Sequence, residues 1–231
     1  MATMANEELI AGVRAGLRAA ADPLRAVGSQ SYMKSDMPTL GVRVPEVRKI
    51  TTGAAAQWPC RSFEELRDTV LELWRTAVFR EERYAAIDLT GARPARGRLE
   101  MLPVYEEIIR TGAWWDLVDG VAHRICDLLQ AHRPELDRVL RSWSSDPDMW
   151  VRRAAITAQL GAKSATDPVL LASVIEPNLA DREFFIRKAI GWALREYAKT
   201  DADWVRQFVA RHETGLSPLS RREALRNLPA R

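Results

Sequence analysis

Apolar side chains recur every three to four residues along almost the whole chain, which is the spacing of a helix with one buried face. The sequence has no convincing alternation of β-branched and polar residues between turns, so the pattern predicts an all-α fold. A short helix is predicted after Pro23, followed by an irregular stretch at 31–43. The other helices are predicted at about 6–21, 45–58, 63–75, 80–91, 97–110, 114–131, 134–144, 147–160, 167–180, 183–199, 202–212 and 218–228.

Residues with strong positional preferences mark two of the helix boundaries. Ser62 precedes one predicted helix, and Glu65 follows it by three residues, which is a capping-box pattern. Gly112 ends one helical pattern, and the pair Trp114-Trp115 opens the next. The segment around residues 112–115 is therefore predicted to join two helices.

The sequence contains an internal repeat with an offset of 34 residues. Residues 150–156 (Trp-Val-Arg-Arg-Ala-Ala-Ile) match residues 184–190 (Phe-Phe-Ile-Arg-Lys-Ala-Ile), and the same step upstream of Arg153 reaches Asp119. A period of this size with two helices per unit indicates a helical solenoid, whose stacked units bury a continuous core and line a concave surface. Asp119 and Arg153 are therefore expected to hold equivalent places and to face the same groove.

The amino-acid composition is typical of a globular protein. Of its 231 residues 47% are hydrophobic and 28% charged, and we predict a single domain over residues 1–231. The apolar runs are interrupted well before the length of a membrane span. The N-terminal residues 1–8 carry acids where a signal peptide carries bases, so a cytoplasmic location is expected.

The charge pattern favours nucleic acid as the partner. The formal net charge is only +3, but five of the 34 basic residues are lysine and the others are arginine, which recognises phosphate through planar, bidentate contacts. The two cysteines have no metal-binding or redox spacing, and the three histidines show no ligand pattern, so no metal and no cofactor is predicted. These residues are Cys60, Cys126, His123, His132 and His212.

The start of the helix predicted at 114–131 offers candidate chemistry. On a helix, Trp115 and Asp119 project from one face about a turn apart, whereas Asp116 lies on a different part of the surface. An aromatic ring beside a carboxylate suits a flat, cationic ligand. A buried tryptophan beside a solvated acid would have the same spacing, and only the motifs along the rest of the chain favour a site.

Six segments together resemble a known family. The longest of them, Glu183–Thr200, is the most specific, because solenoid packing alone would not demand its Gly-Trp and Arg-Glu-Tyr pairs. The chain is similar over nearly its whole length to AlkD-type DNA alkylation-repair glycosylases, which are built from HEAT-like repeats. The segments are Ser31–Lys34, Leu40–Arg48, Trp114–Asp119, Trp150–Ile156, Glu183–Thr200 and Pro218–Ala224.

The resemblance implies a right-handed α-solenoid with a concave DNA-binding groove. It also implies a monofunctional glycosylase that excises cationic N-alkylated purines, such as 3-methyladenine and 7-methylguanine, from duplex DNA in base excision repair. The family's active-site positions fall on residues of the expected type, which are Tyr32, Trp115, Asp119, Arg153 and Trp192.

The chemistry of such a lesion agrees with these residues. A purine alkylated at N3 or N7 is cationic and leaves as a neutral base, so no general acid is needed. Asp119 is the candidate that stabilises the positive charge growing on the deoxyribose and aligns the attacking water. Trp115 and Trp192 can face the lesion or its sugar, with about 0.5–2 kcal/mol per cation–π contact. Tyr32 would complete the aromatic cleft, and Arg153 would bind a phosphate or, alternatively, orient Asp119.

Basic residues on the repeat helices and near the chain ends are the candidates for binding the DNA backbone. Each of them could instead be ordinary solvated surface charge, but their concentration favours a phosphate-binding stripe. The other tryptophans, Trp114 and Trp150 among them, are interpreted as packing residues. The candidate DNA-binding residues besides Tyr32 and Arg153 are Lys34, Arg43, Arg187, Lys188, Arg195, Lys199, Arg221 and Arg222.

Two other functions are compatible with the solenoid pattern. One is a HEAT-like scaffold that binds a peptide in its concave face, and the other is a DNA-structure-binding relative without glycosylase activity. A scaffold gives no reason to combine Asp119 with Trp115, Arg153 and Tyr32, and an inactive relative would be expected to lack the carboxylate. We therefore predict a monomeric, cytoplasmic glycosylase that associates with the nucleoid when bound to DNA. Whether the base is flipped into a pocket or excised near the stack stays open.

Overall fold

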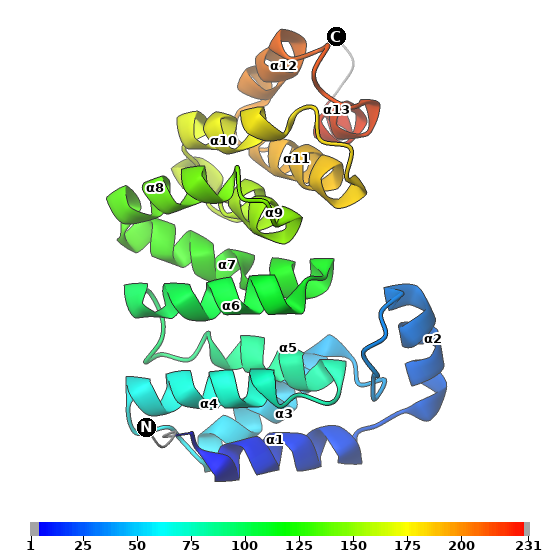
Figure 1. Cartoon of the computed structure of the whole chain (residues 1–231), viewed down its shortest axis with the longest axis vertical. Helices are drawn as coiled ribbons and strands as arrows, with labels where there is room; N and C mark the ends of the chain where they lie inside the picture. The colour runs from blue at the N-terminus through cyan, green and yellow to red at the C-terminus, as the bar shows by residue number, and fades with distance from the viewer. Residues whose placement is uncertain (1–4, 229–231) are drawn as a thin grey trace. The chain divides into compact units, whose positions relative to one another are not determined.

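The computed structural model describes residues 5–228, so the first half of the acidic N-terminal segment lies outside the described residues. Within this range the chain forms thirteen α-helices and three short 3₁₀ helices and no β-strand (Figure 1). The prediction of an all-α fold is confirmed. Each of the described helices is too short or too polar to span a bilayer.

The described chain divides after Val104 into two compact units. The prediction of one domain over 1–231 stays a prediction. In the first unit α5 packs against α1, α3 and α4, and α2 stands beside this group (Figure 1). Its helices are α1 (Glu7–Ala19), α2 (Pro23–Met33), α3 (Val44–Gln57), α4 (Phe63–Arg75), α5 (Arg80–Leu89) and a 3₁₀ helix (Leu99–Met101), and α6 (Leu102–Gly112) contains the boundary.

The second unit has the helical-repeat architecture that the sequence predicts. Neighbouring helices pack in the order α7, α9, α11 and α13, and α8, α10 and α12 connect them and pack beside them. The 34-residue step places Asp119 on α7, Arg153 on α9 and Arg187 on α11. The helices are α7 (Trp115–Ala131), α8 (Arg133–Trp143), α9 (Met149–Thr157), α10 (Pro168–Ile175), α11 (Phe184–Tyr197), α12 (Ala202–Arg211) and α13 (Pro218–Leu225), with 3₁₀ helices at Lys163–Ala165 and Glu176–Asn178.

One local prediction needs correction. The irregular stretch was expected to begin at Ser31, but α2 continues to Met33 and Tyr32 lies in its last turn, and Lys34 ends the helix in the left-handed region at φ 49°. The prediction that Gly112 ends a helix is confirmed, since Gly112 is the last residue of α6, and Ala113 after it is left-handed at φ 43°. Ser62 caps α4 as predicted, since its Oγ accepts the Glu65 amide at 3.1 Å, but the Glu65 carboxylate accepts the Arg61 amide rather than the Ser62 amide of a capping box.

The Gly-Trp pair in the segment 183–200 has a packing reason, contrary to the expectation that packing would not demand it. Gly191 on α11 is buried against α13, and a Cβ atom at this position would lie 2.5 Å from Glu223 Cβ and 3.0 Å from the Ser220 carbonyl oxygen. These distances are shorter than van der Waals contact. Only glycine lets the two helices approach this closely.

We expect Gly191→Ala to destabilise the protein by about 1–3 kcal/mol, because the added methyl group overpacks the contact between α11 and α13. The matched control is Gly53→Ala on the exposed face of α3, where nothing lies within 4 Å of the new methyl group. This control should stabilise by about 0.5–1 kcal/mol through helix propensity alone. Urea unfolding measured by circular dichroism compares the two, and equal effects would contradict the close approach.

Candidate active site

Asp119 and Arg153 form a bidentate ion pair between α7 and α9. Arg153 Nε donates to Asp119 Oδ1 at 2.9 Å, and Arg153 Nη2 donates to Oδ2 at 2.7 Å. The Asp119 side chain is only 15% exposed and the Arg153 side chain only 6%. The 34-residue repeat thus brings these two residues together, as predicted, and both are turned toward each other on adjacent helices.

A third helix joins this pair through the backbone. Arg153 Nη1 donates to the carbonyl oxygen of Phe185, the second residue of α11, at 2.6 Å. The guanidinium therefore donates three hydrogen bonds to protein groups. Of the two roles predicted for Arg153, this geometry corresponds to the second, in which Arg153 orients Asp119. The Phe185 carbonyl could not be found from the sequence, because a backbone acceptor leaves no residue signature.

Two effects of its surroundings act in opposite directions on the pKa of Asp119. Burial raises the pKa of the Asp119 carboxyl above its ordinary value, and the hydrogen bonds and charge of Arg153 act in the lowering direction. The net direction is a raised pKa. Each carboxylate oxygen accepts one bond from Arg153, which leaves acceptor capacity on both oxygens for a water or a ligand.

Two tryptophans predicted to belong to the site lie on α7, which carries Asp119, and on α11, whose Phe185 carbonyl oxygen accepts a hydrogen bond from Arg153. Trp115 is the first residue of α7, one turn before Asp119, and Trp192 lies on α11. Both indoles are half-buried and keep part of their surface accessible. They are thus placed in the same unit as the ion pair, on α7 and α11.

An aromatic cluster packs the starts of the same three helices together. The ring of Trp114 lies 6.0 Å from that of Trp150 and 5.7 Å from that of Phe185, and the rings of Trp150 and Phe185 are 5.0 Å apart. Trp114 and Trp150 are therefore packing residues, as predicted. The indole nitrogen Nε1 of Trp114 is buried and has no hydrogen-bond partner within residues 5–228.

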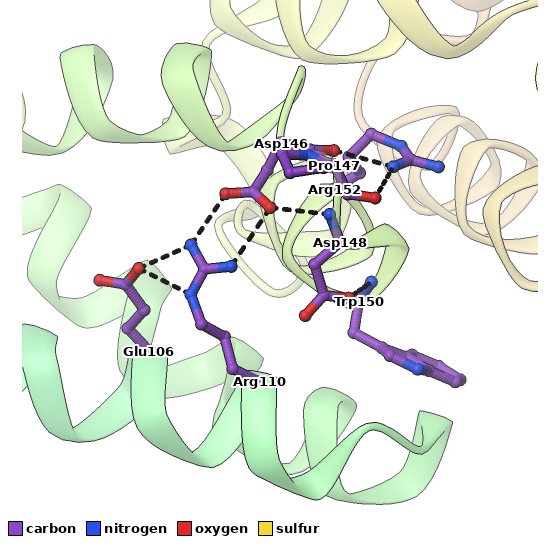
Figure 2. A network of polar contacts seen from close by, with 7 residues as sticks. All are labelled: Glu106, Arg110, Asp146, Pro147, Asp148, Trp150 and Arg152. Carbon is purple, nitrogen blue, oxygen red and sulfur yellow. Dashed lines mark hydrogen bonds and ion pairs between the residues drawn. The ribbon is translucent and has the colours of Figure 1, made fainter.

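A polar network fixes the start of the helix that carries Arg153 (Figure 2). Arg110 on α6 donates to both carboxylate oxygens of Asp146, at 3.2 and 2.8 Å, and these bonds lower the pKa of Asp146. Asp146 in turn accepts the Asp148 amide at 2.8 Å, and Asp148 caps α9 by accepting the Trp150 amide at 2.9 Å. The network therefore sets where α9 begins.

Arg152, which precedes Arg153 on α9, extends this network to α11. Arg152 donates to the Asp146 carbonyl oxygen at 2.8 Å and to the Asp181 carboxylate at 2.9 Å. Asp181 also accepts the amide of Glu183, the residue that precedes α11, at 2.8 Å. Side-chain hydrogen bonds thus fix the relative positions of the two helix starts that supply Arg153 and Phe185.

Several basic side chains predicted to bind phosphate form ion pairs inside the second unit. Lys188 and Arg195, both on α11, converge on the carboxylate of Glu223 on α13. Lys199 pairs with Glu196 three residues earlier, at 2.7 Å. These contacts also give Arg195 a structural reason to stand in the specific segment 183–200.

The remaining predicted phosphate ligands of the second unit differ from one another. Arg221 pairs with Glu213 at 3.1 Å, and Arg222 is exposed. Arg187 is half-buried, and its Nε atom has no hydrogen-bond partner in the described part of the chain. This Nε atom is buried, so it is not presented to a phosphate in this conformation.

The predicted site residues of the first unit lie at and after the end of α2. Tyr32 is 74% exposed, and Lys34 and Arg43 are exposed as well. Their predicted position opposite Trp115 stays a prediction. In residues 5–228 no group of three or more His, Cys, Asp and Glu side chains is arranged to hold a metal ion.

Comparison with known proteins decides the family. The sequence model of the family described as DNA alkylation repair enzyme matches residues 13–228. The chain belongs to this family. No curated protein sequence matches the chain significantly.

A solved structure agrees with this family. A predicted DNA alkylation repair enzyme from Enterococcus faecalis is similar with a TM-score of 0.81 and 31% identity, covering 91% of this chain and 98% of that one. A weaker similarity, with a TM-score of 0.41 and 16% identity, covers 96% of this chain and 61% of the alkylpurine DNA glycosylase AlkC from Pseudomonas fluorescens, solved with DNA containing an abasic-site analogue.

We expect Arg153→Met to destabilise the fold by about 3–5 kcal/mol, because it leaves the Asp119 carboxylate buried without its counter-charge. The double variant Asp119→Asn/Arg153→Met leaves no buried charge, so its loss should be smaller than the sum of the single losses by about 2 kcal/mol. Arg96→Met, at an exposed position, should change stability by less than about 0.5 kcal/mol. Urea unfolding tests this cycle, and additive losses would show that the two residues do not act as a pair.

Proposed function

We propose that the chain is a monofunctional DNA glycosylase that excises cationic N-alkylated purines from duplex DNA. The substrates would be of the 3-methyladenine and 7-methylguanine type, and the reaction is hydrolysis of the N-glycosidic bond without a metal or cofactor. The observation that carries the proposal is the Asp119 carboxylate, held by two hydrogen bonds from a buried arginine one turn from a partly exposed tryptophan, in a member of the DNA alkylation repair enzyme family.

The arrangement suits a reaction in which the leaving group is already activated. A cationic purine departs as a neutral base, so the developing charge lies on the deoxyribose. Asp119 would stabilise that charge and align the attacking water through the acceptor positions that Arg153 leaves free. A carboxylate fixed before the substrate arrives needs no reorganisation during bond cleavage, and its effect is stronger in a partly water-excluded site.

Aromatic side chains would recognise the lesion by its charge. Trp115 and Trp192 keep accessible indole surface on α7 and α11, and an alkylated, cationic purine or its sugar can lie against such a ring. Tyr32, with most of its side chain exposed, would contact the DNA from the first unit. The preference for a cationic base over a normal one then follows from the same charge that makes the base a good leaving group.

The DNA backbone would be bound by the basic residues that retain free donors. The exposed Arg222, Lys34 and Arg43 and the half-buried Arg187 fit this role better than Arg153, whose side chain is only 6% exposed and donates three hydrogen bonds to protein groups. The ion-paired Lys188, Arg195, Lys199 and Arg221 would contribute through their remaining donors. We place the enzyme in the cytoplasm as a monomer acting in base excision repair, associated with the nucleoid when bound.

We expect Asp119→Asn to slow the release of 7-methylguanine by about 10²–10³-fold, because the substitution keeps the shape of the side chain but removes its negative charge. The measurement is single-turnover excision from a duplex that contains 7-methylguanine at saturating enzyme, where differences in binding no longer count. Chromatography detects the free base, and circular dichroism verifies that the variant is folded.

The matched control is Asp116→Asn on the same helix. It removes a like charge that raises the pKa of Asp119, so it favours the ionised carboxylate and should not slow the reaction. Release of base at the wild-type rate by Asp119→Asn would exclude the carboxylate mechanism. A wild-type protein that binds the duplex but releases no base would identify it as a non-catalytic DNA-binding relative.

A further inference from the structure

The helix that carries Tyr32, α2, has no fully buried side chain. Its apolar side chains Leu24 and Val27 are 90% and 73% exposed. Leu24, Val27 and Tyr32 follow one another at positions i, i+3 and i+8, so they lie along one stripe of the helix. The opposite face is half-buried, but only two of its five residues, Arg25, Ala26, Ser29, Gln30 and Met33, are apolar, so apolar packing contributes little to the orientation of α2.

The segment that follows α2 is instead fixed by a buried carboxylate. Glu81, in the first turn of α5, is 1% exposed. Its two oxygens accept four hydrogen bonds from one run of four residues, donated by Thr39 Oγ1 at 2.5 Å and by the amides of Leu40 at 2.9 Å, Gly41 at 2.8 Å and Val42 at 3.2 Å.

This run is also what the base of α2 contacts. The Leu40 carbonyl oxygen accepts the Asp22 amide at 2.8 Å, and the Gly41 carbonyl oxygen accepts Arg25 Nη1 at 2.8 Å. Gly41 has φ 77°, and a Cβ atom there would lie 2.3 Å from the Asp22 carbonyl oxygen. The position of α2 therefore depends on Leu40 and Gly41, and these depend on Glu81.

The neighbouring residue provides a natural comparison. Glu82 is buried to the same degree as Glu81, but it contacts Arg14 on α1 at 3.3 Å, Arg18 at 3.7 Å and the Val78 amide at 3.1 Å. Burying a carboxylate is costly unless hydrogen bonds replace its water. Glu82 meets that cost by joining α5 to α1, whereas Glu81 meets it by ordering residues 39–42.

We propose that Glu81 is a positioning residue that holds α2 in the orientation in which Tyr32 contacts DNA. This inference rests on the proposed function, in which Tyr32 is a DNA contact. Glu81 itself touches no DNA; it acts through the 39–42 run and the base of α2. The Glu81 carboxylate thereby replaces the apolar packing that α2 lacks.

The test compares Glu81→Gln with Glu82→Gln, which remove the same charge from adjacent buried positions. Glutamine has one acceptor oxygen where glutamate has two, so Glu81→Gln cannot keep all four bonds. We expect hydrogen exchange of the amides in residues 23–42 to rise by about tenfold or more in Glu81→Gln only, which is the factor typical of losing one charge-assisted bond.

Function is measured on the same variants as binding of a 7-methylguanine duplex by fluorescence anisotropy and as single-turnover excision. We expect Glu81→Gln to reproduce the defect of Tyr32→Ala, and the double variant Glu81→Gln/Tyr32→Ala to show no further defect. Glu82→Gln should bind and excise like the wild type even if it unfolds at a lower temperature. Thr39→Val removes one of the four bonds to Glu81 without changing the size of the side chain, and it should show the same defect more weakly. It replaces Glu81→Gln in the test if that variant does not fold.

The outcomes separate this inference from the proposed function. Equal exchange and equal binding in Glu81→Gln and Glu82→Gln, or wild-type binding by Tyr32→Ala, would overturn the positioning role. A wild-type protein without excision would refute the glycosylase, but amide exchange and duplex binding would still decide whether Glu81 positions Tyr32.

Discussion

The bidentate ion pair between Asp119 and Arg153 joins α7 to α9, and the Phe185 carbonyl oxygen extends it to α11. Removing two charges from water is unfavourable, and a well-packed apolar pair would often be as stable or more stable. A repeat protein has no need of such a pair to stack its helices. Under the proposed function the pair has an explanation, because it would fix a carboxylate in a partly water-excluded position before the substrate binds.

The rest of the second unit fixes the helices that supply this pair. Arg110 and Asp146 set the start of α9, Arg152 and Asp181 link it to the start of α11, and the rings of Trp114, Trp150 and Phe185 pack where these helices begin. The first unit uses the same principle, since buried carboxylates of α5 order α1 and residues 39–42. Each repeat contacts mainly its neighbours, so such local polar contacts determine how neighbouring helices are aligned with one another.

Helix periodicity predicted the all-α fold, and the 34-residue repeat predicted that Asp119 and Arg153 hold equivalent places on neighbouring helices. The sequence could not decide between a phosphate and Asp119 as the partner of Arg153, because that choice depends on the distance between two packed helices. The convergence of Lys188 and Arg195 on Glu223 was missed for the same reason. The packing role of Gly191 was missed because the close approach of α13 is a property of tertiary packing.

The pH dependence of base release tests the central claim, that Asp119 acts as a fixed carboxylate. Burial raises the pKa of Asp119 above 3.8, so the neutral form persists to a higher pH than for a free aspartate. Single-turnover release, corrected for spontaneous depurination, should therefore fall in the wild type as the pH is lowered through this raised pKa. The same acidic decline should be absent in Asp119→Asn. An Asp119→Asn variant with an unchanged acidic decline would contradict the account, because another group would then be the one that must be ionised.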